Sequence, residues 1–176
     1  MGAGKTSVGR ALGQRLNWNF EDLDDRIERR EGRTIAEIFR DSGEPAFRQA
    51  EWAALQQVLE ELRGGAAAVV ALGGGTFAQS AVHQILQESR IKTVFLDAEL
   101  PELWARCAQQ GSGAKRPLQA SQNVFRELHA KRLPFYRTAS LRIDTTGKQV
   151  EAIAAEIGER LKLKPVAMRT EQGESE

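Results

Sequence analysis

Met1-Gly2-Ala3-Gly4-Lys5-Thr6 opens the sequence, and these residues match the last six positions of the pattern G-x-x-x-x-G-K-[ST]. In that pattern, successive backbone N–H groups surround phosphate oxygens, and the following helix adds its positive amino-terminal end. Val8, Leu12 and Leu16 recur at helical spacing, so we expect a helix to begin at about Gly4. The alternative is a glycine-rich cap that binds no ligand.

The side chains of this segment suit a nucleotide. Lys5 can reach the β- and γ-phosphates, and the Thr6 hydroxyl can ligate Mg²⁺. The first glycine of the full pattern would lie two residues before Met1, and the strand that feeds such a loop would lie before that glycine.

The composition describes a single domain of 176 residues without a dominant charge. The chain has 25 basic and 24 acidic residues and a net charge of +1, which argues against a partner such as nucleic acid or a membrane surface. Cys107 is the only cysteine, so no internal disulfide can form, and a reducing cytoplasm fits. No apolar run approaches the ~20 residues of a membrane span. We expect residues 1–164 to form the domain and the polar residues 165–176 to be disordered.

Strand and helix patterns alternate along the chain. Strand-like apolar runs lie at 18–23, 66–72, 93–96 and 141–143, and helical patterns at 35–40, 45–63, 79–87, 101–108, 123–136 and 150–161. The helix at 123–136 is expected to be interrupted near Pro134. This alternation predicts an α/β domain with a parallel sheet, whose strands at 66–72 and 93–96 are buried on both faces. Ligands of such sheets bind at the carboxyl ends of the strands.

Two pairs of charged residues carry candidate chemistry. Asp22 and Asp24 lie two apart on a predicted strand, so both carboxylates can face the phosphate loop, one to hold Mg²⁺ and the other to orient or deprotonate a hydroxyl. The alternative is helix capping by Asp24 within a solvated acidic patch. Arg48 and Glu51 lie three apart on a helix, either as a clamp for a carboxylate or as an ordinary surface ion pair.

Two loops are candidates for ligand contact. Gly73-Gly74-Gly75 follows a predicted strand and allows the backbone to approach a ligand closely, unless it is only a tight turn. Residues 109–121 form a polar loop with Lys115 and Arg116, which can close over a phosphate site as a mobile lid or remain a solvated basic face.

The segments MGAGKTSVGR, FEDLDDRIE, GRTIAEIF, EPAFRQAE, LGGGT, AKRPL, AKRLPFYR and LRIDTT, taken together, resemble the shikimate kinase family. They follow one another in family order from Met1 to about Leu161. The resemblance implies an enzyme of aromatic amino-acid biosynthesis, a cytoplasmic monomer that uses ATP and Mg²⁺ to phosphorylate shikimate. Two alternatives remain: a gluconate or nucleotide kinase of the same fold, and a non-catalytic or low-activity remnant.

The resemblance also implies a role for each matching residue. Lys5, Asp24 and Arg116 would be catalytic, with Asp24 as the base. Thr6 would bind Mg²⁺, and Asp22 would do so through water. The nucleotide would contact Gly2, Ala3, Gly4, Lys5, Thr6, Ser7, Arg106 and Arg116. The acceptor would contact Asp24, Arg48, Gly73, Gly74, Gly75 and Arg132, between walls made by Phe39 and Phe47.

The implied fold is a three-layer α/β/α sandwich of the P-loop kinase type, with strand order 2-3-1-4-5. The central first strand of that order would precede Met1, so the strands near Val70 and Val94 would face a gap. We therefore expect the 176-residue chain to be weakly stable and to bind ATP weakly. An in-frame upstream stretch of roughly ten residues should restore both properties.

Overall fold

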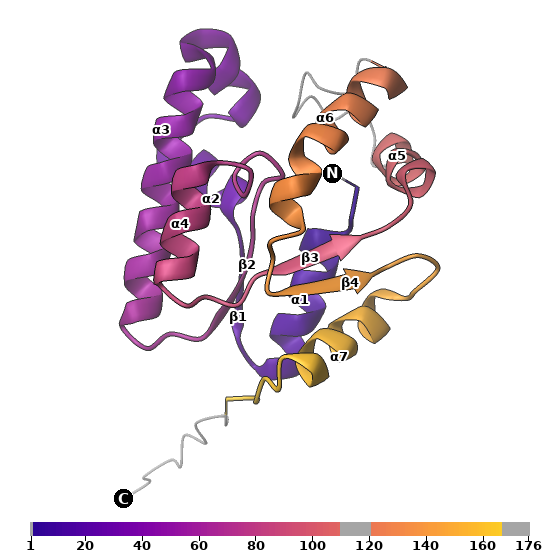
Figure 1. Ribbon diagram of the computed structural model, residues 1–176. Coiled ribbons are helices and arrows are strands. Elements are labelled where there is room, and N and C mark those ends of the chain that lie inside the picture. The colour runs from indigo at the N-terminus through magenta and orange to yellow at the C-terminus, as the bar shows by residue number, and fades with distance from the viewer. Residues whose placement is uncertain (1, 110–120, 167–176) are drawn as a thin grey trace, which may run out of the picture.

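The computed structural model describes residues 2–109 and 121–166, which form eleven helices and strands (Figure 1). Along the chain these are α1 (Lys5–Leu16), β1 (Asn19–Asp22), α2 (Leu23–Glu31), α3 (Ile35–Arg63), β2 (Ala68–Ala71), α4 (Ser80–Glu88), β3 (Val94–Asp97), α5 (Leu100–Gln109), α6 (Gln122–Tyr136), β4 (Leu141–Asp144) and α7 (Val150–Arg160). The alternation of strands and helices confirms the predicted α/β class.

The strands form two parallel pairs. β1 pairs with β2 in the register Asn19 to Ala68, and β3 pairs with β4 in the register Val94 to Leu141. Within residues 2–109 and 121–166, no strand lies between β2 and β3, so the order is β1-β2 and, separately, β3-β4. The expected gap between the strands that carry Val70 and Val94 is therefore present.

Helices cover both faces of these strands, as a three-layer sandwich requires (Figure 1). Successive residues of a strand point to opposite faces. Val69 accordingly packs against the core cluster that contains residues of α1 and α7, and Val70 packs against the cluster that contains residues of α3 and α4. The predicted layers are thus confirmed, with one apolar core on each side of the strands.

A cavity of about 500 Å³ separates β2 from β3, and we call it the central slot. Both strands, the inner faces of α1 and α3, and the last turn of α7 line it with mainly apolar side chains, including Val8, Leu12, Val58, Leu59, Leu62, Val69, Val70, Val94, Leu96 and Ile157. The slot explains why one prediction is wrong, namely that the strands at 66–72 and 93–96 are buried on both faces. Ala71 in β2 and Leu96 in β3 are buried, but their strand neighbours are only half-buried because they border the slot.

Two local predictions, for α2 and α6, need correction, and a third, for α3, is confirmed. The helix α2 was not predicted, and because it begins at Leu23, Asp24 lies in its first turn and not on a strand. The predicted helices 35–40 and 45–63 are confirmed as two helical stretches within α3, because the backbone is non-helical at Gly43, where the element kinks. The helix α6 continues through Pro134 to Tyr136; Pro134 lies in the last turn, so the kink that a proline imposes affects only the end of the helix.

The remaining expectations concern the ends and the lid. Val166 donates its backbone N–H to the carbonyl oxygen of Leu16 at 2.9 Å, so the first two residues of the stretch 165–176 lie next to α1. Residues 167–176 lie outside the described chain, as does most of the predicted lid, 110–120. No helix in 2–109 and 121–166 is both long enough and apolar enough to cross a membrane.

Candidate active site

The phosphate loop leads directly into α1. Gly4 is the N-cap and has a left-handed backbone conformation, with φ at 75°. The first turn of α1 has no acidic residue, so nothing on that turn opposes an anion at the positive helix end. A Cβ on Gly2 would lie 2.4 Å from the carbonyl oxygen of Leu103 in α5, so the loop rests on α5 at a point where only glycine fits.

Asp22 links the phosphate loop to the start of α2. Its Oδ2 accepts a hydrogen bond from the Thr6 hydroxyl at 2.8 Å, and its Oδ1 accepts one from the backbone N–H of Asp24 at 3.1 Å. Asp22, and not Asp24, is therefore the helix cap, which leaves the half-buried side chain of Asp24 in the first helical turn beside this pair. The structure places Thr6, Asp22 and Asp24 together, although the strand geometry predicted for the two aspartates was wrong.

Arg48 and Glu51 do not form an ordinary surface pair. Glu51 is 2 % exposed, and it accepts hydrogen bonds from Arg48 Nη1 at 2.7 Å and Gln79 Nε2 at 2.6 Å, and a short one from the Thr76 hydroxyl. Burial opposes the charge of Arg48, but the hydrogen bonds to Glu51 and Glu44 prevail and raise the pKa of Arg48 above its ordinary value. The guanidinium is thus a fixed cation supported by a buried carboxylate.

A second arginine meets Arg48 at the glycine turn. A Cβ added to Gly75 would lie 3.1 Å from Arg48 Nη2 and 3.2 Å from Arg132 Nη2, so guanidinium groups from α3 and α6 converge on this residue. Arg132 Nη1 is buried and has no hydrogen-bond partner within the described ranges. Two adjacent cations with a donor left over suit an anionic ligand. We call Arg48, Glu51, Gly75, Thr76, Gln79 and Arg132 the arginine cluster.

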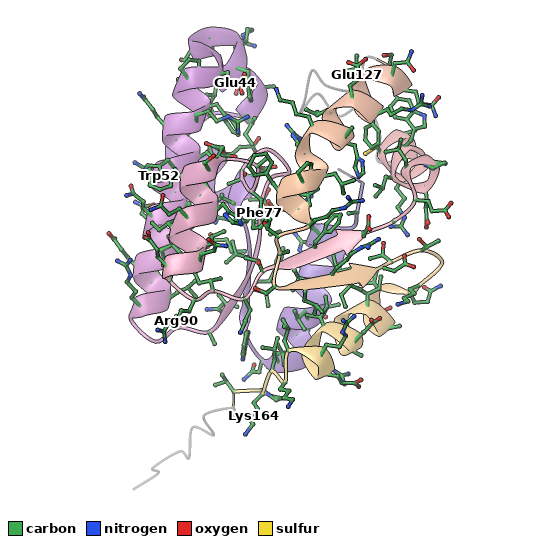
Figure 2. All side chains as sticks on the ribbon, in the orientation of Figure 1. Glu44, Trp52, Phe77, Arg90, Glu127 and Lys164 are labelled. Atoms are coloured by element: carbon green, nitrogen blue, oxygen red, sulfur yellow. The ribbon has the colours of Figure 1, made fainter. Side chains whose placement is uncertain are left out.

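The surroundings of the arginine cluster fix its shape. The Tyr136 hydroxyl donates to the carbonyl of Gly74 at 2.8 Å, which ties α6 to the glycine turn. The rings of Phe39 and Phe47 stack in α3 with centroids 4.7 Å apart, and the Phe47 ring also contacts the Arg48 guanidinium. In Figure 2, Glu44 lies near the upper end of α3, and Phe77, which follows the glycine turn by two residues, lies between α4 and α6.

The predicted nucleotide residues beyond the loop are only partly visible. Arg106 in α5 donates to Glu102 at 2.5 Å and to the hydroxyl and carbonyl oxygens of Thr145 at 3.2 Å, so its guanidinium is anchored beside the end of β4. Arg116 and Lys115 lie outside the described residues.

The sequence pattern did not single out Thr76, Gln79 or Thr145. Thr76 directly follows the glycine triplet, and that position was the one available signal for it. Gln79 and Thr145 lie 28 and 39 residues from the side chains they bind, so no spacing rule identifies them.

Comparisons with known proteins agree with this geometry. The family model described as Shikimate kinase matches residues 1–162. A shikimate kinase of Cereibacter sphaeroides is 39 % identical over 98 % of this chain and 84 % of its own length. The shikimate kinase of Persephonella marina is 35 % identical over 92 % of this chain and 94 % of its own length. The structure of a shikimate kinase from Acinetobacter baumannii in complex with shikimate superposes with a TM-score of 0.81 at 34 % identity, covering 92 % of this chain and 88 % of that one.

Proposed function

This chain belongs to the shikimate kinase family. From that membership we propose which residues bind the acceptor, which bind the nucleotide and which act in catalysis. The function is the ATP-dependent phosphorylation of shikimate to 3-phosphoshikimate. The relatives and the solved structure named above are all shikimate kinases, which favours this function over a gluconate or nucleotide kinase. The roles assigned below rest on the geometry of the described residues.

The acceptor is held by the arginine cluster. Arg48 and Arg132 bind the shikimate carboxylate, and the spare donor on buried Arg132 Nη1 is the observation that carries this assignment. The backbone of Gly73, Gly74 and Gly75 lines the acceptor pocket, and Phe39 and Phe47 form its wall. A planar carboxylate matches a guanidinium fork, whereas an uncharged sugar face does not.

The nucleotide is held by the phosphate loop. The backbone of Gly2, Ala3 and Gly4 and the first-turn amides of α1 surround the phosphates, with Lys5 on the β- and γ-phosphates and Thr6 and Ser7 at the helix start. Arg106, anchored by Glu102 and Thr145, lies against the base. Arg116, outside the described residues, supplies a lid cation to the γ-phosphate.

Thr6 and Asp22 suit a magnesium ion. They offer a hydroxyl and a carboxylate oxygen 2.8 Å apart, and Mg²⁺ prefers such hard ligands and keeps most of its remaining sites for phosphate and water. Consistent with that preference, residues 2–109 and 121–166 contain no cluster of three or more His, Cys, Asp or Glu residues able to cage a metal. Bound there, the ion would neutralise phosphate charge, with Thr6 as the direct ligand and Asp22 as a ligand through water.

Asp24 acts as the base. It accepts the proton of the shikimate 3-hydroxyl as that oxygen attacks the γ-phosphorus of ATP and the bond to the β–γ bridging oxygen breaks, which releases ADP. Lys5 and Arg116 stabilise the charge that shifts onto the phosphate oxygens. The rest of the catalysis is positioning, since no covalent intermediate on the protein is needed. We further propose that the enzyme works as a cytoplasmic monomer.

A panel of acceptors tests this proposal. ADP release is measured with shikimate, with a shikimate analogue lacking the carboxylate, with gluconate and with nucleoside monophosphates. Shikimate should be the preferred acceptor, and the analogue should lose affinity because Arg48 and Arg132 have no carboxylate to bind. Equal affinity for shikimate and the analogue would remove both arginines from the acceptor site. ATP binding without phosphorylation of any acceptor would favour a non-catalytic remnant.

A further inference from the structure

A side-chain hydrogen bond joins α4 to the segment that follows α6. His83 Nε2 in α4 and the hydroxyl oxygen of Thr138, 55 residues away in the sequence, lie 2.7 Å apart. The His83 side chain is half-buried, and its ring meets the Phe77 ring edge to face, with centroids 5.8 Å apart. Phe77 lies between α4 and α6 (Figure 2). We call the pair of His83 and Thr138 the α4–α6 junction.

The direction of this hydrogen bond follows from the other bond that the hydroxyl makes. Thr138 Oγ1 donates its single hydrogen to the carbonyl oxygen of Phe135 at 2.6 Å. Because that hydrogen is used, the Thr138 oxygen accepts from His83, which must therefore carry a proton on Nε2. The backbone N–H of Thr138 also donates to Phe135, at 3.0 Å, so the accepting hydroxyl is held against the last turn of α6.

On the α4 side, the junction starts in the turn that supports Arg48. Gln79 is the N-cap of α4, and its carbonyl oxygen accepts from the backbone N–H of His83 at 3.0 Å. The Gln79 side chain donates to Glu51 at 2.6 Å, and Glu51 also accepts from Arg48 at 2.7 Å. The helical turn that carries the His83 ring is therefore the turn that supports the carboxylate partner of Arg48.

On the α6 side, the junction holds the end of the helix that carries Arg132. Arg132 lies about one helical turn before Phe135, whose carbonyl oxygen binds Thr138. Tyr136 anchors the same end, since its hydroxyl donates to Gly74 at 2.8 Å and its ring contacts an aromatic ring of β3. The end of α6 is thus attached to the glycine turn, to β3 and, through the junction, to α4.

We propose that His83 is a positioning residue for the acceptor site, which keeps Arg48 and Arg132 at their observed spacing by tying α6 to α4. The two guanidinium groups come from different helices and converge on Gly75, so their separation depends on how those helices are held together. A pair of cations that is already in position loses less freedom when a carboxylate binds. The inference rests on the proposed function, because it takes the shikimate carboxylate as the ligand of both arginines.

Steady-state kinetics of the 176-residue chain test the proposal. His83→Leu, which keeps an apolar neighbour for Phe77, and Thr138→Val each remove the hydrogen bond, so each should raise the KM for shikimate about three- to tenfold. The kcat and the KM for ATP should change by less than about twofold, because the proposed base and phosphate loop lie on other elements. Gln87→Leu, at an exposed position one turn along α4, is the matched control and should change none of the three values.

Conservative variants separate positioning from a general loss of stability. Thr138→Ser keeps the hydroxyl and His83→Gln keeps an N–H donor, so both should keep a KM for shikimate within about twofold of that of the unmodified chain. The double variant H83L/T138V should raise the KM no more than either single variant, since both changes remove one bond. Additive effects in the double variant, or an unchanged KM in the single variants, would overturn the proposal.

NMR measures the direction of the hydrogen bond without turnover. At about pH 8, above the ordinary pKa of histidine, proton–nitrogen spectra of the imidazole should show the single proton of His83 on Nε2. A proton on Nδ1 instead would contradict the assigned direction and overturn the proposal.

Amide hydrogen exchange separates this inference from the proposed function. The amides of 137–139, which bond to the last turn of α6, should exchange about three- to tenfold faster in His83→Leu and in Thr138→Val than in the unmodified chain, but not in Gln87→Leu. Unchanged exchange in the first two variants would overturn the proposal even if shikimate is phosphorylated. Faster exchange in a chain that does not phosphorylate shikimate would refute the proposed function and, with it, the acceptor role of His83, while leaving the junction itself intact.

Discussion

In the arginine cluster, the buried carboxylate of Glu51 meets three donors, from Arg48, Thr76 and Gln79, whereas along the central slot the inner edges of β2 and β3 meet no strand in the described chain. Both regions adjoin the glycine turn after β2, but they differ in how buried polar groups find hydrogen-bond partners. The cluster uses side chains from α3 and from the loop before α4. The slot is bordered instead by mainly apolar side chains.

This difference teaches that the acceptor site and the sheet can be damaged separately. A change in the arginine cluster or at Asp24 should alter catalysis or acceptor affinity, with a loss of stability only where a buried hydrogen bond is removed, and a change along the slot should alter stability alone. The following predictions, in order of decreasing effect, either sharpen that separation or break it.

Asp24→Asn should lower kcat by about 10²–10⁴-fold while ATP affinity changes little, because the amide cannot accept the proton of the acceptor hydroxyl. Steady-state kinetics and ATP titration measure the two quantities. The matched control is Asp25→Asn, one residue along the same helix turn, which should keep most of the activity. Retained kcat in Asp24→Asn would refute the assignment of this residue as the base.

Arg48→Ala and Arg132→Ala should each weaken shikimate binding by about 10–150-fold, since each removes a charge-assisted hydrogen bond of about 1.5–3 kcal/mol. ATP affinity should stay close to that of the unmodified chain. Arg126→Ala, an exposed arginine on the same helix as Arg132, is the control and should leave both affinities unchanged. The variants should also cease to distinguish shikimate from the analogue without a carboxylate; continued discrimination would count against the assignment.

Thr76→Val should reduce the free energy of unfolding by about 1–3 kcal/mol and raise the KM for shikimate, because buried Glu51 loses a donor and Arg48 loses part of its support. Urea unfolding and steady-state kinetics report the two effects. Thr146→Val, at an exposed position, should stay within about 0.5 kcal/mol of the unmodified chain. If both variants lose the same stability, the hydroxyl of Thr76 does not hold Glu51.

Gly75→Ala should raise the KM for shikimate by roughly three- to tenfold, because the added methyl group displaces both guanidinium groups by a few tenths of an ångström. The KM for ATP should not change, and the melting temperature should fall only slightly. An unchanged KM for shikimate would mean that the two arginines do not need their observed spacing.

Gly158→Ala should raise the free energy of unfolding by about 0.5–1 kcal/mol, the smallest effect in this series. Gly158 lies inside α7, and no atom lies within 4 Å of where its Cβ would be, so alanine adds helix propensity without a clash. The KM for shikimate should stay the same. A change in KM would show that α7 and the arginine cluster are coupled, against the separation of the two regions.

The sequence was sufficient for the α/β class, for the positions of the four strands in the described residues and for the start of α1 next to Gly4. These features depend on local patterns, namely apolar runs, helical spacing and glycine at a phosphate loop, which the chain carries within a few residues. The proximity of Thr6 to Asp22, and of Arg48 to Glu51, also followed from motifs. The helix α2 escaped prediction because LDDRIERRE has few apolar residues to mark a helical period.

Only the tertiary structure decided how separate segments meet. Glu51 is buried because Thr76 and Gln79, 25 and 28 residues away, close over it, and this burial changes an apparent surface ion pair into a fixed cation site. Arg132 reaches Gly75 because Tyr136 ties α6 to the turn at Gly74. Likewise, the apolar runs at 66–72 and 93–96 indicated buried strands, but the three-dimensional arrangement left their inner edges on a common slot. Local patterns record the preferences of neighbouring residues, whereas burial and the partners of a backbone edge depend on which distant segments pack together.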